Sequence, residues 1–420
     1  MSLAKSIVYG GCYRETCITP HHDQLMGSGL RACLVLSNLA PKYLHVWHTW
    51  LSDTDRQNVA GALAASPSIQ LSEIESNKRA PSTPSFHYLN PLAPPTLHFN
   101  WPASDSIVPD IQAESALVFG TLEKRPSITA STVVYDPQSP DKPDLFFANG
   151  STASRCALVL NHKEAARLAS EKDIYAASKL LQNYLLKGKK PAYEVLVVKM
   201  AHAGCWVCTR DEITPVPAYR TNSVFSIGSG DVFSAAFYAR WALGGDTATQ
   251  AADFASKVTA NYCESGVISS KITSMEGADL KQPLPTVAPD VAAYKKRIYL
   301  AAPFFTQGEI VLVEHLRDVL TTPWTSVFSP LHEVGYGGPK EVYKPDIQGL
   351  EESDLIFAVL SGLDTGTIFE VGYATKIPKR VFCLAEAVAQ SDLTMILGSG
   401  AVVETDITTA VYKTLWATLD

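Results

Sequence analysis

The sequence lacks the features of a membrane-spanning or nucleic-acid-binding protein. No apolar run approaches the ~20 residues needed to cross a bilayer, and the first twenty residues hold charged side chains without the apolar stretch of a secretion signal. No run of basic residues stands out, and 35 Lys and Arg against 42 Asp and Glu give a formal net charge of −7. We therefore expect a cytoplasmic protein that binds neither a membrane nor a nucleic acid polymer.

The eight cysteines show neither a disulfide framework nor a complete metal site. They are spread through a chain of 420 residues, which favours reduced thiols. Cys205 and Cys208 form one Cys-x-x-Cys pair without the second pair that a zinc site needs. This pair lies in an apolar, strand-like run, so we expect both side chains in the core.

The chain is long enough for two domains. Its length exceeds the size at which single cores stop growing, and 46% hydrophobic with 18% charged residues excludes a disordered protein. Residues 276–297 are interrupted by Pro283, Pro285 and Pro289, and a new strand-like run follows directly. We predict domains at 1–288 and 289–420.

Short runs rich in β-branched residues alternate with helix-compatible stretches in both parts, which predicts an α/β fold class. In the first part we expect strands at residues 6–9, 131–135, 157–160 and 193–198, and helices at 163–187 and 232–243. In the second part we expect strands at 298–301, 355–360 and 380–384, and helices near 309–320 and 369–374. The proline-rich residues 72–104 are expected to form loops and edge elements, either as a surface excursion or as a substrate lid.

A glycine turn opens a helix in the first part. Gly228, Ser229, Gly230 and Asp231 precede an apolar helical run that ends at two glycines. Glycines at a helix N-terminus let backbone N–H groups close around an anion, and the helix dipole favours a transferred phosphate. Asp231 is placed to take the proton of an acceptor hydroxyl. The alternative is that Asp231 only caps the helix.

A second polar pair follows a strand-like run upstream. Asn161 and Glu164 are one helical turn apart and therefore share a face. Their oxygens suit a magnesium ion held through water, because Mg²⁺ prefers oxygen ligands and retains much of its hydration. The alternative is an N-capped helix start.

The order of these segments resembles the ribokinase-like (PfkB) family of sugar and nucleoside kinases over roughly residues 1–285. The resemblance implies Mg²⁺ and ATP as cofactors, an anion hole at Gly228, Ser229 and Gly230, and Asp231 as the catalytic residue. Asn161 and Glu164 then serve the metal, and Gly204 closes the ATP turn, in which Ala201 replaces a glycine.

The substrate side of this resemblance departs from the family pattern. The early substrate-binding aspartate is matched by Glu15, after Gly10 and Gly11. The asparagine of the family's glycine segment is matched by Arg31 in MGSGLRA, which also carries Gly27 and Gly29. These changes imply altered recognition of the phosphate acceptor.

The second part carries carboxylates around a glycine-containing turn. Asp364 and Glu370 are six residues apart, so a loop carboxylate and a helical carboxylate converge at the C-terminal edge of a parallel sheet, where ligands bind in open α/β folds. Asp346 lies upstream of the same strand. Convergent carboxylates are what glycosyl transfer needs, one to attack the anomeric carbon and others to handle protons and hydroxyls.

Residues 296–390 resemble the nucleoside 2-deoxyribosyltransferase family. The segment YLAAPFF from Tyr299 and the segment DTGTIFEVGYA from Asp364 carry the resemblance. It implies a flavodoxin-like domain in which Glu370 is the nucleophile, Asp346 and Asp364 contact and protonate the base, and Tyr299 positions the nucleophile. It also implies a homo-oligomer and no cofactor for this domain.

Together these observations predict a bifunctional enzyme of nucleoside metabolism. The second domain would transfer a 2-deoxyribosyl group between bases, and the first would phosphorylate a sugar or nucleoside with Mg-ATP. Nucleosides, nucleobases and a pentose or nucleoside acceptor are the expected partners. The alternatives are an N-glycoside hydrolase governed by a kinase-like sensing domain, and a kinase-like domain that only binds its ligand.

Overall fold

The computed structural model describes residues 3–74, 83–99, 110–139, 141–188, 193–268, 282–288 and 295–420. It divides into two compact units, Met1–Asp290 (unit 1) and Val291–Asp420 (unit 2). Residues 276–281 and 289–294, within the proline-rich segment where we expect the domain boundary, lie outside the described residues.

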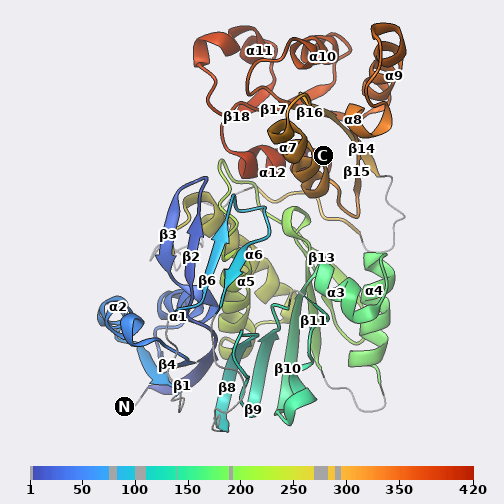
Figure 1. Ribbon diagram of the computed structural model, residues 1–420. Coiled ribbons are helices and arrows are strands. Elements are labelled where there is room, and N and C mark those ends of the chain that lie inside the picture. The colour runs from blue at the N-terminus through green and yellow to red at the C-terminus, as the bar shows by residue number, and fades with distance from the viewer. Residues whose placement is uncertain are drawn as a thin grey trace. The chain divides into compact units, whose positions relative to one another are not determined.

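Unit 1 is built on a nine-stranded sheet (Figure 1) in the order β13-β12-β11-β10-β9-β8-β1-β4-β5. Its strands from β5 to β11 are parallel to their neighbours, and β12 and β13 are antiparallel. The strands are β1 (Ala4–Tyr9), β4 (Tyr43–Thr49), β5 (Ile69–Glu73), β8 (Ile111–Phe119), β9 (Ile128–Asp136), β10 (Thr152–Asn161), β11 (Val195–Lys199), β12 (Cys205–Cys208) and β13 (Ile213–Val216). The four strands expected at residues 6–9, 131–135, 157–160 and 193–198 correspond to β1, β9, β10 and β11.

A second, four-stranded sheet in unit 1 has the order β3-β2-β6-β7. It contains β2 (Arg14–Cys17), β3 (His22–Leu25), β6 (Ser85–Tyr88) and β7 (Thr96–His98). The last two strands fall within the proline-rich residues 72–104, of which 75–82 and 100–104 lie outside the described residues. The small sheet carries Glu15 on β2.

Unit 1 has six α-helices among its described residues. They are α1 (Gly27–Leu39), α2 (Asp53–Ala64), α3 (His162–Ala169), α4 (Ile174–Leu181), α5 (Ser229–Tyr238) and α6 (Ala248–Ser265). Residues of α1, α5 and α6 share one buried cluster with β1, β4 and β11. Helix α5 continues as a π-helical turn, Ala239–Leu243, so the expected helix at 232–243 is present.

The stretch expected to be helical at residues 163–187 is helical, but it is divided into two helices. The segment forms α3 and α4, and α4 continues as a π-helical turn, Gln182–Leu186. Ser170 follows α3 with a left-handed φ of 55°. The Asp173 side chain then accepts a hydrogen bond from Ala176 N and starts a new helix. A local N-cap therefore overrides the continuous helical pattern.

Unit 2 is a five-stranded, all-parallel sheet in the order β15-β14-β16-β17-β18. This order, 2-1-3-4-5 along the chain, is that of flavodoxin-like folds. Its strands are β14 (Lys296–Ala301), β15 (Thr325–Phe328), β16 (Leu355–Val359), β17 (Arg380–Leu384) and β18 (Val402–Glu404). Its helices are α7 (Gln307–Leu320), α8 (Pro330–Glu333), α9 (Pro339–Glu352), α10 (Thr365–Lys376), α11 (Thr394–Gly398) and α12 (Ile407–Ala417). The expectation of a flavodoxin-like α/β fold is confirmed.

Cys205 and Cys208 are both buried on β12 as free thiols, as expected of core residues. Among the described residues, no three His, Cys, Asp or Glu side chains are grouped so as to hold a metal ion. None of the helices in the described ranges is long and apolar enough to cross a membrane.

Candidate active sites

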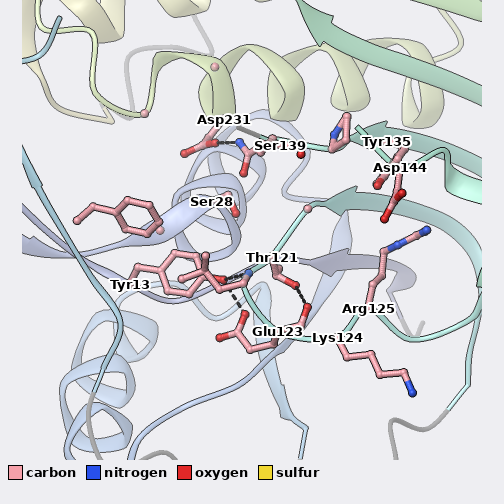
Figure 2. A pocket seen from close by; sticks show the side chains of 18 of the residues that line it. Tyr13, Ser28, Thr121, Glu123, Lys124, Arg125, Tyr135, Ser139, Asp144 and Asp231 are labelled. Carbon is pink, nitrogen blue, oxygen red and sulfur yellow. Dashed lines mark hydrogen bonds between the residues drawn. The ribbon is translucent and has the colours of Figure 1, made fainter. Parts of the chain in front are cut away.

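Asp231 lies at the start of α5, beside a cavity of about 860 Å³ in unit 1. Gly228 precedes the helix with a left-handed φ of 76°, a conformation that favours glycine. Figure 2 shows Asp231 at the end of this helix, with Tyr13, Thr121 and Glu123 across the cavity from it. The glycine turn and the carboxylate predicted from the sequence therefore lie together at one cavity.

Arg31 reaches Asp231 from helix α1. Its guanidinium Nη1 donates to Asp231 Oδ2 at 2.6 Å and to Glu15 Oε1 at 3.1 Å, and Nη2 donates to Glu15 Oε2. Arg31 is 1% exposed. Glu15 Oε1 also accepts from Gly27 N at 3.2 Å. The two substrate-side positions that depart from the kinase pattern, Glu15 and Arg31, are thus partners in one buried ion-pair network with Asp231.

The second oxygen of Asp231 is also engaged. The Gln138 side-chain amide donates to Asp231 Oδ1. Burial raises the pKa of Asp231, while the Arg31 charge lowers it. Gln138 holds a left-handed φ of 47°, a strained conformation for a residue with a side chain. Sequence reasoning missed Gln138, although it follows the strand-like run 131–135 by three residues.

Asn161 and Glu164 form a capping box at the start of α3. Asn161 Oδ1 accepts from Glu164 N at 2.9 Å, and Glu164 Oε2 accepts from Asn161 N at 2.8 Å. Glu164 Oε1 accepts from Ser139 N at 2.9 Å. Burial, together with the nearby Asp136 carboxylate, raises the pKa of Glu164 to about 7. Asn161 and Glu164 thus cap the start of a helix, which was the alternative interpretation of this pair. Both carboxylate oxygens of Glu164 already accept a hydrogen bond.

These residues do not form a direct coordination shell for magnesium. Each oxygen described above is held by a backbone N–H group, and the described residues bring no third carboxylate, cysteine or histidine into a ligand group here. A cation already present beside them is Lys199, whose Nζ donates to Asp136 Oδ2 at 2.7 Å. The predicted magnesium role of Asn161 and Glu164 remains a prediction.

Lys199 and Asp136 are site residues that sequence reasoning missed. They end strands β11 and β9, on either side of β10, and so share the carboxyl edge of the sheet with Asn161. Ser234 of α5 also donates to Asp136, at 2.6 Å. A Cβ on Gly230 would lie 3.4 Å from Lys199 Nζ, so the ammonium group reaches the glycine turn. The sequence signal that could have indicated Lys199 and Asp136 is their position, because each is a charged residue directly after an apolar run.

The turn expected to hold ATP keeps the backbone of a glycine turn. Ala201, where the family has glycine, adopts a left-handed φ of 49°. Gly204 has a φ of 82°, and a Cβ there would lie 2.1 Å from Val216 O. Gly204 is therefore required by the close approach of β13.

The cavity wall opposite Asp231 is aromatic and polar. Tyr13 and Phe86 lie 5.5 Å apart between ring centroids, and the Tyr13 hydroxyl donates to Glu123 Oε2 at 2.6 Å. Burial raises the pKa of Glu123. Ser28 Oγ is buried at the cavity and has no hydrogen-bond partner among the described residues. Sequence reasoning missed Tyr13, Phe86 and Glu123, which carry no motif and come from three separate segments of the chain; Ser28 lies within the quoted segment MGSGLRA but was not singled out.

In unit 2, Tyr299 and Glu370 are in direct contact. The Tyr299 hydroxyl donates to Glu370 Oε1 at 2.5 Å. Tyr299 lies in the buried part of β14, and Glu370 lies in the middle of α10. Burial raises the pKa of Glu370 to about 7; the Tyr299 hydrogen bond lowers it, and the negative charges of Asp346 and Asp364 raise it further. The predicted nucleophile and its predicted positioning residue therefore lie together.

Asp346 and Asp364 flank this pair from two helices. Asp346 lies on α9, and burial raises its pKa to about 6. Its Oδ1 is buried without a hydrogen-bond partner among the described residues. Asp364 caps α10: its Oδ2 accepts from Thr367 N at 2.8 Å and from Thr367 Oγ at 3.1 Å. Asp346 thus has a buried oxygen without a hydrogen-bond partner among the described residues, whereas Asp364 also caps a helix.

Packing holds Tyr299 in place. Its ring stacks on Phe328 with centroids 5.4 Å apart and planes at 15°. A Cβ on Gly349 of α9 would lie 2.3 Å from Phe328 Cζ, so α9 approaches the ring as closely as a glycine allows. Gly349 and Phe328 are positioning residues that the sequence patterns did not indicate.

Two family models match the chain in the two regions described above. Residues 129–271 match pfkB family carbohydrate kinase, and residues 298–406 match nucleoside 2-deoxyribosyltransferase. Both resemblances expected from the sequence are therefore confirmed. The chain combines a PfkB-family region with a nucleoside 2-deoxyribosyltransferase-family region. No curated protein matches it.

Solved structures of ribokinase-family kinases are similar to part of the chain. A pyrophosphate-dependent kinase of that family, in complex with a pyrophosphate analog and myo-inositol, is 13% identical, with 65% of this chain and 99% of that chain covered at a TM-score of 0.47. Ribokinase from Thermotoga maritima is 14% identical, with 64% and 96% covered at 0.42. Fructokinase from Vibrio cholerae O395, bound to fructose, ADP and calcium, is 12% identical, with 63% and 94% covered at 0.45.

Proposed function

We propose that unit 2 transfers a 2-deoxyribosyl group from a deoxynucleoside to a second base, with Glu370 as the nucleophile. The observation that carries this proposal is the 2.5 Å hydrogen bond from Tyr299 to Glu370 in a buried setting with two further carboxyl groups nearby. The hydrogen bond fixes one oxygen of Glu370 and leaves the other to attack the sugar.

The reaction is a double displacement. A Glu370 oxygen forms a bond to the anomeric carbon as the C–N bond breaks. The electron pair of the C–N bond leaves with the base. The departing base takes its proton from Asp346, whose pKa of about 6 lets the protonated form be present near neutrality. A second base then attacks the anomeric carbon from the opposite face, releases Glu370 and returns its proton to Asp346.

The experiment supplies a β-deoxynucleoside with an isotopically labelled second base and follows the products by NMR. We expect a labelled nucleoside of β configuration, because two inversions restore the starting geometry. An α-configured product would contradict double displacement. Free deoxyribose as the sole product at saturating base would show a hydrolase instead.

Unit 1 has two candidate functions. The first is phosphoryl transfer from Mg-ATP to a sugar or nucleoside, with Asp231 as the base and the turn from Gly228 to Gly230 at the transferred phosphate. The second is ligand binding without transfer. The Arg31 contact favours the second, because the oxygen of Asp231 that faces Arg31 is already in an ion pair at 2.6 Å. ATP consumption with pentoses and nucleosides separates the two.

For the whole chain we also propose that it forms homo-oligomers. Unit 2 has four aromatic side chains that are each more than half exposed, Phe305, Tyr336, Tyr343 and Phe369. Such a concentration of exposed apolar surface is typical of interaction sites. Light scattering coupled to size-exclusion chromatography tests this, and a monomer at micromolar concentration would contradict it.

A further inference from the structure

The cavity of unit 1 holds a charge arrangement that a transferase of neutral acceptors does not need. Two carboxylates, Glu15 and Asp231, meet one guanidinium, that of Arg31. All three side chains are less than a tenth exposed. The positive charge comes from the protein itself and not from a ligand.

The position of Arg31 matters as much as its charge. A Cβ on Gly228 would lie 2.2 Å from both Cζ and Nε of Arg31, so the guanidinium lies directly against the turn that leads into Asp231. A hydroxyl that gives its proton to Asp231 must come within hydrogen-bond distance of that carboxylate, about 2.6–3.2 Å. The guanidinium occupies part of this space.

The same contacts occupy part of the hydrogen-bond acceptor capacity that a sugar would use. Glu15 accepts from Arg31 through both of its oxygens, and Asp231 accepts from Arg31 and Gln138. A polyol must share these oxygens with Arg31 and Gln138 or displace the two donors, since each carboxylate oxygen offers only about two acceptor sites. Displacement leaves a buried arginine without its partners, which is strongly unfavourable.

The cavity nevertheless has room for a ligand. Its volume of about 860 Å³ lies within the range of small-molecule sites. Tyr13, Phe86 and Tyr88 supply aromatic faces, and Ser28 and Thr121 supply hydroxyl groups. Aromatic rings beside a few polar groups suit a planar base joined to a sugar, so the lining favours a nucleoside over a bare pentose.

We propose that Arg31 converts the kinase-like site of unit 1 into a nucleoside-binding site, in which Asp231 is a structural ion-pair partner and not a general base. This inference develops the second candidate function of unit 1. It does not depend on the reaction of unit 2.

The first test measures thermal unfolding of the full chain for wild type, Asp231→Asn, Arg31→Met and the double variant. We expect Asp231→Asn to lower the melting temperature by several degrees, because it removes the negative partner of a buried arginine. In the Arg31→Met background the same substitution should raise the melting temperature, because it removes one of two like charges left together. Asp144→Asn, at an exposed carboxylate that lines the same cavity, is the control.

An unchanged or raised melting temperature for Asp231→Asn in the presence of Arg31 would overturn the structural role. This single variant decides the point even if Arg31→Met fails to fold.

The second test uses the Glu370→Gln chain, so that unit 2 does not consume the probes. Adenosine, guanosine, cytidine, uridine, their 2′-deoxy forms and ribose are each supplied with Mg-ATP, and ADP is measured. We expect no more ADP than in the Asp231→Asn/Glu370→Gln chain. ADP formation that depends on an acceptor and is lost with Asp231→Asn would overturn the proposal.

Binding is measured by calorimetry with the same nucleosides and without ATP. We expect nucleosides to bind the chain. We also expect Ser28→Leu to weaken binding at one of the binding sites at least tenfold, since Ser28 lines the cavity of unit 1. Binding that Ser28→Leu leaves unchanged would overturn the nucleoside assignment. Base exchange by the unmodified chain is followed separately, so a failure of the unit 2 reaction is not mistaken for a failure of this proposal.

Discussion

The hydroxyl of Tyr299 donates a 2.5 Å hydrogen bond to Glu370 across 71 positions of the chain. Tyr299 lies in strand β14 of the unit 2 sheet, and Glu370 lies on helix α10, which follows the neighbouring strand β16. The contact brings a phenol and a carboxylate together at the carboxyl edge of the sheet, where open α/β folds bind their ligands.

Glu370→Gln should abolish glycosidic-bond cleavage and leave the fold intact. The amide has the same shape but cannot act as a nucleophile. We expect a loss of about 10³-fold or more in turnover. The measurement is base exchange by chromatography, with circular dichroism to confirm folding. Turnover near that of the wild type would exclude Glu370 as the nucleophile.

Tyr299→Phe should lower turnover by about 10- to 100-fold, since a hydrogen bond to a charged group contributes about 1.5–3 kcal/mol. Because the Tyr299 hydrogen bond lowers the pKa of Glu370, its loss should also move the acid limb of the pH–rate profile to higher pH. Tyr373→Phe is the matched control, because the Tyr373 hydroxyl bonds to Glu351 at an exposed position. A rate loss without a pH shift would contradict the stated role of Tyr299.

Stability should decline as pH rises through the titration of Glu370. Burial raises its folded-state pKa from the ordinary value of 4.5 to about 7. The folded chain therefore binds more protons than the unfolded chain between these values, and stability is lost as pH increases. We expect a loss of about 1–3 kcal/mol between pH 4.5 and 7.5 from this group. Urea denaturation across that pH range measures the free energy of unfolding. Glu370→Gln should make this free energy depend less on pH. An equal slope against pH in both proteins would refute the raised pKa of Glu370.

Gly349→Ala should reduce both stability and activity of unit 2. The new Cβ would lie 2.3 Å from Phe328 Cζ, so the ring must shift, and Tyr299 stacks on that ring. Overpacking of this kind costs about 1–3 kcal/mol. Gly308→Ala, where no atom lies within 4 Å of the added Cβ, is the control. Equal melting temperatures and rates for both variants would show that the contact does not position Tyr299.

Residues 1–288 and 289–420 should fold when expressed separately. Each unit has its own sheet and its own buried cluster, so each can bury a core without the other. Separate expression followed by thermal unfolding checks this, and base exchange should remain with residues 289–420. If neither fragment is soluble, the boundary is misplaced or the two folds depend on each other.

The sequence by itself determined the two α/β regions and indicated some of the side chains that the structure brings together in each of them. Hydrophobic runs with β-branched residues were enough to predict β1, β9, β10, β14 and β17. A strand that is buried on both faces consists of consecutive apolar residues, which are visible in the local sequence. The motifs around Asp231 and Glu370 were found for a similar reason, since a glycine turn followed by a helix is a short-range pattern. The break between α3 and α4 was not found, because one capping side chain outweighed a continuous helical pattern.

Only the tertiary structure decided which charges meet. Asp231 is 200 positions from Arg31 in the sequence, and nothing local predicts that the guanidinium that binds Glu15 also binds Asp231. Likewise, Lys199 and Asp136 became site residues only when parallel strands brought their ends to one edge. The physical reason is that an ion pair depends on distance in space and on burial, and both are set by how the strands and helices pack.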